Sequence, residues 1–296
     1  MVTHMNRARA IDAPDCLLGE NPVWYEPTGE YLWTDILCGT IYAYASETGC
    51  VRTVLETPYQ TGAFLAAENG DLVVFTERGV FAVAWSGGVF HLLQKPLWTV
   101  PFAEGERFND AIADPCGQML SGSKRADNTQ GKLYRFSAGK APEVLLERLA
   151  ISNGMGFSPD GRTFYHTDSV PSTITAYDYA PSRPLDHPRV VVRLDASVDP
   201  DGLTVDAEGN LWFACWGAGR IEHVTPQGIQ LGTLQLDAPQ CSSLCFGGTG
   251  LNDLFVTSAS VGSEPNKPPL GGRCFLQKNA GTGKPEYYAK TNPVGV

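Results

Sequence analysis

Four side chains that carry amide or carboxylate oxygens stand at matching places in the sequence, each just before a short apolar run. They are Glu20, Asn109, Asn153 and Asp201. A turn glycine follows eight residues after three of them and nine residues after Glu20. Such oxygens are the ligands that hard divalent cations prefer, so the four residues would make a cation site if the fold brought them together. Taken alone, the Asp-Gly pair at Asp201 would indicate only a tight turn.

The same spacing recurs along the chain and predicts six repeated units. Two weaker copies begin at Gly62 and Ser242, so the six leading positions lie 41 to 48 residues apart, near 20, 62, 109, 153, 201 and 242. Each unit contains short runs rich in aromatic residues, Val and Thr, separated by turn residues, and no amphipathic helix of three turns is evident. A period in the forties is typical of propeller blades. We therefore expect an all-β, six-bladed β-propeller that forms one domain over residues 1–296.

The register of the repeat predicts a metal-binding channel at the centre of this fold. In a propeller the innermost strands surround one channel, so equivalent residues converge on its axis. Two carboxylates and two amides gathered there would repel one another or lack partners without a cation. Oxygen ligands favour Ca, Mg or Mn, and Zn or Fe(II) is also compatible. The alternative is that each residue only caps its strand, but Gly62 and Ser242 show that the fold does not require a carboxylate or amide at this place.

The ring of blades must also close. Residues 7–12 are predicted to supply the outermost strand of the last blade. Residues 260–272 are rich in Pro and Gly, and we expect them to be a long insertion in that blade.

Composition excludes several classes of protein. The net charge of −10 and the pI near 5.0 leave no basic surface for nucleic acid or for a membrane. No signal peptide and no run of 18 apolar residues is evident, so we expect a cytoplasmic protein. We also expect a monomer or weak oligomer. The eight cysteines are scattered and are expected to be free thiols in a reducing compartment.

Several longer stretches are distinctive when taken together. They read LLGENPVWYEPTGEYLWTDILCGTIYAY, RFNDAIADPCGQML, SNGMGFSPDGRTFYHTDS, DPDGLTVDAEGNLWFACWG and PPLGGRCF. In these stretches the chain resembles, over nearly its full length, the senescence marker protein/gluconolactonase/regucalcin-like family. The resemblance implies a six-bladed propeller with one divalent cation in its channel and an enzyme that hydrolyses lactones. It is nearest to bacterial sugar-acid lactonases, which act on pentono- and hexonolactones.

The resemblance also implies roles for individual residues. By motif, Glu20, Asn153 and Asp201 would be the metal ligands, and Asp201 would also be the acid/base. Arg107 and Asn109 of the RFND motif would bind hydroxyl or carbonyl oxygens of the substrate.

Lys124 departs from the usual family pattern. It opens the segment KRADNTQG, residues 124–131, where the family commonly has a hydrophobic or acidic lid. Lys124 is therefore either a contact to a substrate carboxylate or an exposed loop charge. The departure puts the identity of the substrate in doubt more than the fold or the metal.

Other polar residues are expected to have structural roles. Asp110, Asp168 and Asp206 are predicted to make turn or inter-strand hydrogen bonds within their blades. His166 is predicted to be a packed strand histidine.

The hydrolysis of a lactone needs a polarised carbonyl, an activated water and a stabilised oxyanion, which a cation with Asp201 as base would provide. Two other functions stay open. The same site could act on another ester or an organophosphate, or the protein could bind calcium without catalysis. A scaffold propeller would have no need of four oxygen-bearing channel residues, and the chain has no GxSxG, Walker or HExxH motif.

Overall fold

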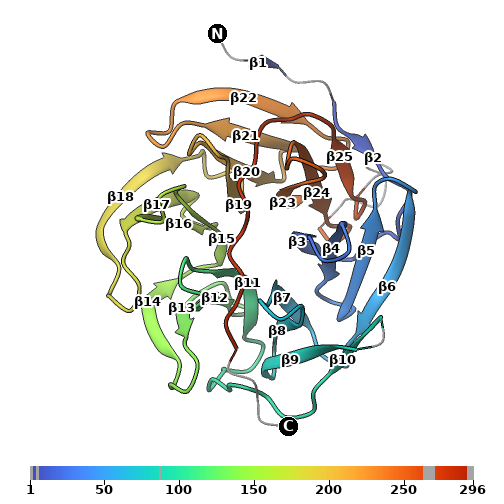
Figure 1. The fold of residues 1–296 in the computed structure, drawn as a ribbon. Coiled ribbons are helices and arrows are strands. Elements are labelled where there is room, and N and C mark those ends of the chain that lie inside the picture. The colour runs from blue at the N-terminus through green and yellow to red at the C-terminus, as the bar shows by residue number, and fades with distance from the viewer. Residues whose placement is uncertain (1–2, 5–6, 87, 263–270, 292–296) are drawn as a thin grey trace.

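The computed structural model describes residues 3–4, 7–86, 88–262 and 271–291. Every regular element in these ranges is a β-strand, so the described chain has no helix that could cross a membrane. Six sheets stand around a common centre, and the protein is a six-bladed β-propeller (Figure 1).

Five blades have four consecutive strands each, numbered outward from the channel. Blade 6 has three consecutive strands and takes its outermost strand from the N-terminal segment. Blades 1 and 2 comprise β3 (Gly19–Tyr25), β4 (Glu30–Asp35), β5 (Thr40–Ala45) and β6 (Cys50–Glu56), then β7 (Thr61–Ala66), β8 (Leu72–Thr76), β9 (Gly79–Ser86) and β10 (Val89–Leu92). Blades 3 and 4 comprise β11 (Arg107–Ala113), β12 (Met119–Lys124), β13 (Gly131–Phe136) and β14 (Glu143–Leu149), then β15 (Ser152–Phe157), β16 (Thr163–Asp168), β17 (Thr173–Asp178) and β18 (Asp186–Arg193). Blades 5 and 6 comprise β19 (Asp199–Val205), β20 (Leu211–Trp216), β21 (Arg220–Val224) and β22 (Gln230–Gln235), then β23 (Cys241–Gly247), β24 (Asp253–Ser258) and β25 (Phe275–Gln277).

The N-terminal segment adds a strand to each of two blades. β2 (Arg9–Ala10) pairs antiparallel with β25 and is the outermost strand of blade 6. β1 (Thr3–His4) pairs in parallel with β22 of blade 5, a contact that the repeat does not predict. Of the insertion expected at 260–272, residues 263–270 lie outside the described residues.

Burial follows the position of a strand within its blade. The inner strand of blade 2 is buried along its whole length, whereas the outer strand of blade 4 is mostly exposed. The turn glycines of the repeat all have positive φ, a region that glycine enters without a Cβ clash. They are Gly29, Gly70, Gly117, Gly161, Gly209 and Gly250. These glycines therefore permit the first hairpin of each blade.

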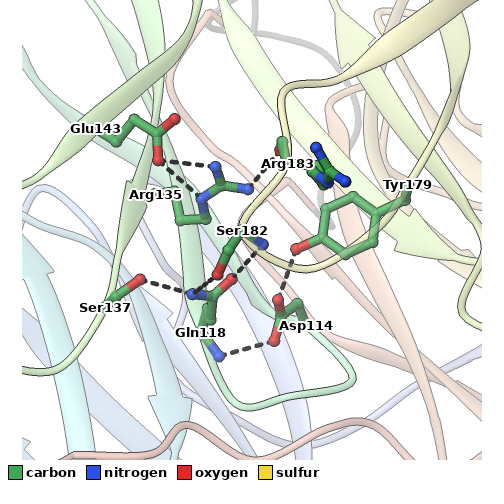
Figure 2. A network of polar contacts seen from close by, with 8 residues as sticks. All are labelled: Asp114, Gln118, Arg135, Ser137, Glu143, Tyr179, Ser182 and Arg183. Atoms are coloured by element: carbon green, nitrogen blue, oxygen red, sulfur yellow. Dashed lines mark hydrogen bonds and ion pairs between the residues drawn. The ribbon is translucent and has the colours of Figure 1, made fainter.

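Neighbouring blades are joined by apolar clusters, one at each of the six junctions. The junction of blades 3 and 4 adds a polar network, which Figure 2 shows. In it the Tyr179 hydroxyl donates to Asp114 Oδ2 at 2.6 Å, and Gln118 Nε2 donates to the hydroxyls of Ser137 and Ser182. This network fixes the two blades that carry the amide side chains of the channel.

All six inner strands carry a β-bulge near their first residues. The pairing shifts between Glu20 and Val23, Thr61 and Ala63, Phe108 and Asp110, Ser152 and Met155, Pro200 and Leu203, and Cys241 and Leu244. A bulge leaves residues out of the ladder and turns their side chains. The unpaired residues include Asn109, Asn153 and Asp201, so the bulges direct the channel side chains.

The C-terminal tail crosses the opposite end of the channel, and Figure 1 shows it in red over the centre of the ring. Gly283 bridges to Asp206 of blade 5 and Ala289 bridges to Ala67 of blade 2. The amide of Lys290 donates to the carbonyl of blade 3 at residue 117. These contacts lie beyond the last residues of the inner strands, and a cavity of about 90 Å³ lies between the tail and those strands.

Candidate active site

Two buried carboxyls lie at the bulged end of the channel. Glu20 of β3 and Asp201 of β19 are each 5% exposed. Burial raises the pKa of Glu20 well above its usual value, and the negative charge of Asp201 raises it further. Burial also raises the pKa of Asp201, while a hydrogen bond with Asn153 lowers it. The three predicted metal ligands therefore lie within electrostatic or hydrogen-bonding reach of one another.

Two oxygens of this group lack hydrogen-bond donors. Asn153 Nδ2 donates to Ser169 Oγ at 3.2 Å, but Asn153 Oδ1 and Asp201 Oδ1 have no donor within the described residues. Buried oxygens without partners destabilise a fold unless something else satisfies them. The described chain has no group of three His, Cys, Asp or Glu that could hold a metal, so a cation at this site would also have to be bound by the amide oxygen of Asn153. Two carboxylates and an amide oxygen are a donor set that fits a hard divalent cation.

Arg107 and Asn109 form a hydrogen-bonded pair beside these acids. Arg107 Nη1 donates to Asn109 Oδ1 at 2.7 Å, and Asn109 Nδ2 donates to the carbonyl of Ser152 at 3.0 Å. Burial lowers the pKa of Arg107 to about 10, while the charges of Glu20 and Asp201 raise it. The guanidinium is therefore cationic at neutral pH and faces the buried acids.

Lys124 lies at the same end of the channel, at the last position of β12, directly across from Arg107. Burial lowers the pKa of Lys124, as does the charge of Arg107, whereas Asp201 and Glu20 raise it. The structure thus gathers all the site residues expected from the sequence, namely Glu20, Arg107, Asn109, Lys124, Asn153 and Asp201.

Asn21 and Asp110 also belong to this region; the sequence interpretation did not consider Asn21 and gave Asp110 only a structural role. Asn21 Nδ2 donates to Asp110 Oδ1 at 3.3 Å, and Asn21 Oδ1 accepts from the amide of Phe64 at 2.7 Å. Burial raises the pKa of Asp110 to about 7. The sequence predicts that Asp110 makes turn or inter-strand hydrogen bonds within its blade, and its Oδ1 does accept from the amide of Ala111 at 2.7 Å, but the bond with Asn21 also joins blade 3 to blade 1. The available signal was the position of each residue directly after a channel residue, Asn21 after Glu20 and Asp110 after Asn109.

Two other aspartates have the structural roles expected of them. Asp168 accepts from the amides of Ala150 and Ile151, which lead into β15. Asp206 accepts from the amide of Asn210 and so closes a turn.

His166 is buried, as expected, and bonds to the strand that carries Asn153. Its Nε2 lies 2.7 Å from Ser152 Oγ, and burial lowers the pKa of His166 to about 3, so the ring is neutral. Ser152 thus contacts His166 through its hydroxyl and Asn109 through its carbonyl.

The fold and the site place the chain in the class of six-bladed propellers that have a buried, oxygen-rich polar site on the axis of the channel. Within this class, the chain belongs to the SMP-30/gluconolactonase/LRE-like family, whose model matches residues 18–260.

Similar proteins cover nearly the whole chain. Pentonolactonase XacC of Haloferax volcanii is 30% identical, over 96% of this chain and 98% of that protein. Regucalcin of Danio rerio is 31% identical, over 91% of this chain and 94% of that protein. Among solved structures, a luciferin-regenerating enzyme is 26% identical with a TM-score of 0.86, covering 93% of this chain and 96% of that one. The fold is also shared with a calcium-binding regucalcin of Agrobacterium tumefaciens, at 23% identity and a TM-score of 0.87, over 96% of this chain and 97% of that one.

Proposed function

We propose that this protein hydrolyses sugar lactones to the corresponding sugar acids and needs one divalent cation to do so. The observation that carries the proposal is the buried group of Glu20, Asn153 and Asp201, with Arg107 beside it, in which two oxygens have no hydrogen-bond donor among the described residues. The similarity to a pentonolactonase over nearly the full length supports a sugar lactone as the substrate.

Glu20, Asn153 and Asp201 would hold the cation. When bound, it would supply Lewis acidity toward a carbonyl oxygen and toward water. The oxygen ligands are compatible with Ca, Mn, Zn, Mg or Fe(II), so the identity of the cation is left to experiment.

The side chains of the site have separate roles in the reaction. Asp201 accepts a proton from the attacking water and returns it to the ring oxygen as the ring C–O bond breaks. Arg107 and Asn109 orient hydroxyl or carbonyl oxygens of the sugar, and the guanidinium stabilises the negative charge that develops on the carbonyl oxygen.

The first test is the hydrolysis of pentono- and hexonolactones by protein stripped with a chelator and reloaded with each of the five cations. We expect turnover to disappear on stripping and to return with at least one cation. Cation binding without turnover of any ester would instead indicate a non-catalytic calcium-binding protein. Turnover of organophosphates or aryl esters, but not of lactones, would indicate another ester hydrolase with the same site.

The second test is Asp201→Asn, which keeps the shape of the side chain and removes its proton acceptor. We expect kcat to fall by about 10²–10⁴-fold, the usual contribution of a general base. The circular dichroism spectrum should be unchanged. Asp178→Asn, on the exposed outer part of blade 4, is the matched control and should retain full turnover. Normal kcat in Asp201→Asn would remove Asp201 from the mechanism.

A further inference from the structure

Asn21 directly follows Glu20 and lies in the bulge of β3. The pairing of β3 with β4 shifts between Glu20 and Val23, so Asn21 and Pro22 have no partner in the ladder. Asn21 has a φ of 45°, and it is the single residue with positive φ in the six inner strands that the structure describes. Asparagine enters this left-handed region more readily than most other residues, but it stays there only where the surrounding structure holds it.

The side chain of Asn21 joins blade 1 to two other blades. Its Oδ1 accepts from the amide of Phe64 in β7 at 2.7 Å, and its Nδ2 donates to Asp110 Oδ1 in β11 at 3.3 Å. All three residues are buried, so these bonds are shielded from water. The left-handed residue is therefore held by blades to which it does not belong.

The strands that carry the other two proposed ligands are placed in a different way. Gly154 and Gly202 follow Asn153 and Asp201, and a Cβ on Gly154 would lie 2.4 Å from the carbonyl oxygen of Asp201. These two inner strands are thus fixed by direct contact of their backbones. In contrast, β3 and β7 pack less closely than any other neighbouring pair of the described inner strands. The side chain of Asn21 bridges the space between them.

The backbone of Asn21 in turn holds Glu20. The amide of Asn21 donates to Glu20 Oε2 at 3.1 Å, and this is the one hydrogen bond that the carboxylate of Glu20 accepts from the residues that the structure describes. The position of the carboxylate therefore depends on the position of the Asn21 backbone. A ligand that is fixed in advance loses less conformational freedom on binding, and its affinity is higher for that reason.

We propose that Asn21 is a positioning residue, which fixes the carboxylate of Glu20 before a cation binds and so raises the affinity of the site for the cation. The side chain anchors the residue to Phe64 and Asp110, and the backbone amide holds the carboxylate. Asn21 acts through Glu20 and needs no contact of its own with the cation or the lactone. This inference rests on the cation dependence of the proposed function and adds a residue that supports it.

The test is Asn21→Gly, because glycine keeps the left-handed backbone and the amide but lacks the two bonds of the side chain. Titration calorimetry of chelator-stripped protein gives the Kd of each cation that the wild type binds among Ca, Mn, Zn, Mg and Fe(II). We expect Asn21→Gly to raise this Kd by about 10-fold, because two hydrogen bonds that fix the ligand are lost. Asn279→Gly is the matched control. Asn279 also has positive φ, lies exposed, and forms no side-chain hydrogen bond within the described residues, so its Kd should equal that of wild type.

A second measurement separates positioning from a purely structural role. A structural role alone would lower the free energy of unfolding of the stripped protein and leave the Kd of the folded protein unchanged. The rise in unfolding temperature on addition of a fixed concentration of the cation compares each variant with itself, so it applies even if Asn21→Gly is less stable. We expect this rise to be smaller in Asn21→Gly than in wild type and Asn279→Gly.

The outcomes distinguish this inference from the proposed function. Equal Kd values and equal cation-induced rises in wild type and Asn21→Gly would overturn the role of Asn21, while cation-dependent lactone turnover would leave the proposed function in place. Wild-type protein that binds none of the five cations would overturn both.

Discussion

At the scale of single residues, a chain of hydrogen bonds connects the cationic part of the site to a buried histidine. It runs from Arg107 to Asn109, through the carbonyl of Ser152, and from the Ser152 hydroxyl to His166. Because Ser152 directly precedes Asn153, the same chain holds the strand that presents the amide oxygen. The orientation of the site thus depends on the imidazole ring of His166, which bonds to Ser152 and to neither Glu20 nor Asp201.

His166 makes stability depend on pH. Its pKa is near 3 in the folded protein and about 6.5 in an unfolded chain, so the unfolded state binds more protons between these values. The free energy of unfolding should therefore fall on acidification, by up to about 1.4 kcal/mol per pH unit. In urea titrations at pH 7 and pH 5, His166→Gln should lose about 2 kcal/mol less than wild type between the two. The exposed His187, replaced by Gln, is the control, and an identical pH dependence in wild type and His166→Gln would contradict the assignment.

Part of this site can be predicted from the sequence, and part cannot. Glu20, Asn153 and Asp201 recur at the same place in a repeat, so their convergence follows from the fold alone. The bond of Asn21 to Asp110, and that of Ser152 to His166, depend on which side chains face each other after folding, and no period in the sequence records this.

At the scale of elements, glycines in the bulges of three inner strands, at Gly62, Gly154 and Gly202, let neighbouring inner strands approach closely. A Cβ on Gly62 of β7 would lie 2.0 Å from the carbonyl oxygen of Phe108, beside Asn109. Glycine at this weaker copy of the repeat therefore reflects contact between backbones and not the loss of a ligand.

Gly62→Ala should consequently destabilise the fold and displace Asn109. Overpacking of this kind costs about 1–3 kcal/mol, and here the clashing atom belongs to the backbone and cannot rotate away. Urea unfolding should report the lower stability, and KM for the lactone should rise as Asn109 shifts. Gly281→Ala is the control, since its Cβ would meet no atom closer than 3.4 Å. Equal stability of the two variants would argue against close packing at Gly62.

At the scale of the whole molecule, two terminal segments tie the ring together. β2 completes blade 6 from the N-terminal side, and the tail bridges blades 2, 3 and 5 across the channel. The repeat predicts six blades because each blade carries its own turn glycine. It says nothing of the tail, which belongs to no repeat and crosses the ring only once.

Removal of residues 281–296 should weaken the ring, because apolar side chains at the end of the channel lose their cover. We expect the unfolding temperature to fall by about 5–10 °C, corresponding to a few kcal/mol in a chain of this size. A peptide of residues 281–296 added in trans should restore part of the loss. A truncated chain that melts at the wild-type temperature would show that the tail contributes no stability.

The tail lies across one end of the channel, opposite the end at which Glu20 and Asp201 stand. We therefore expect a substrate that reacts at these acids to enter and leave by the other end, where Lys124 stands. A newly formed sugar acid would therefore occupy the path of the next molecule, and accumulated product should slow turnover by competing directly with fresh substrate.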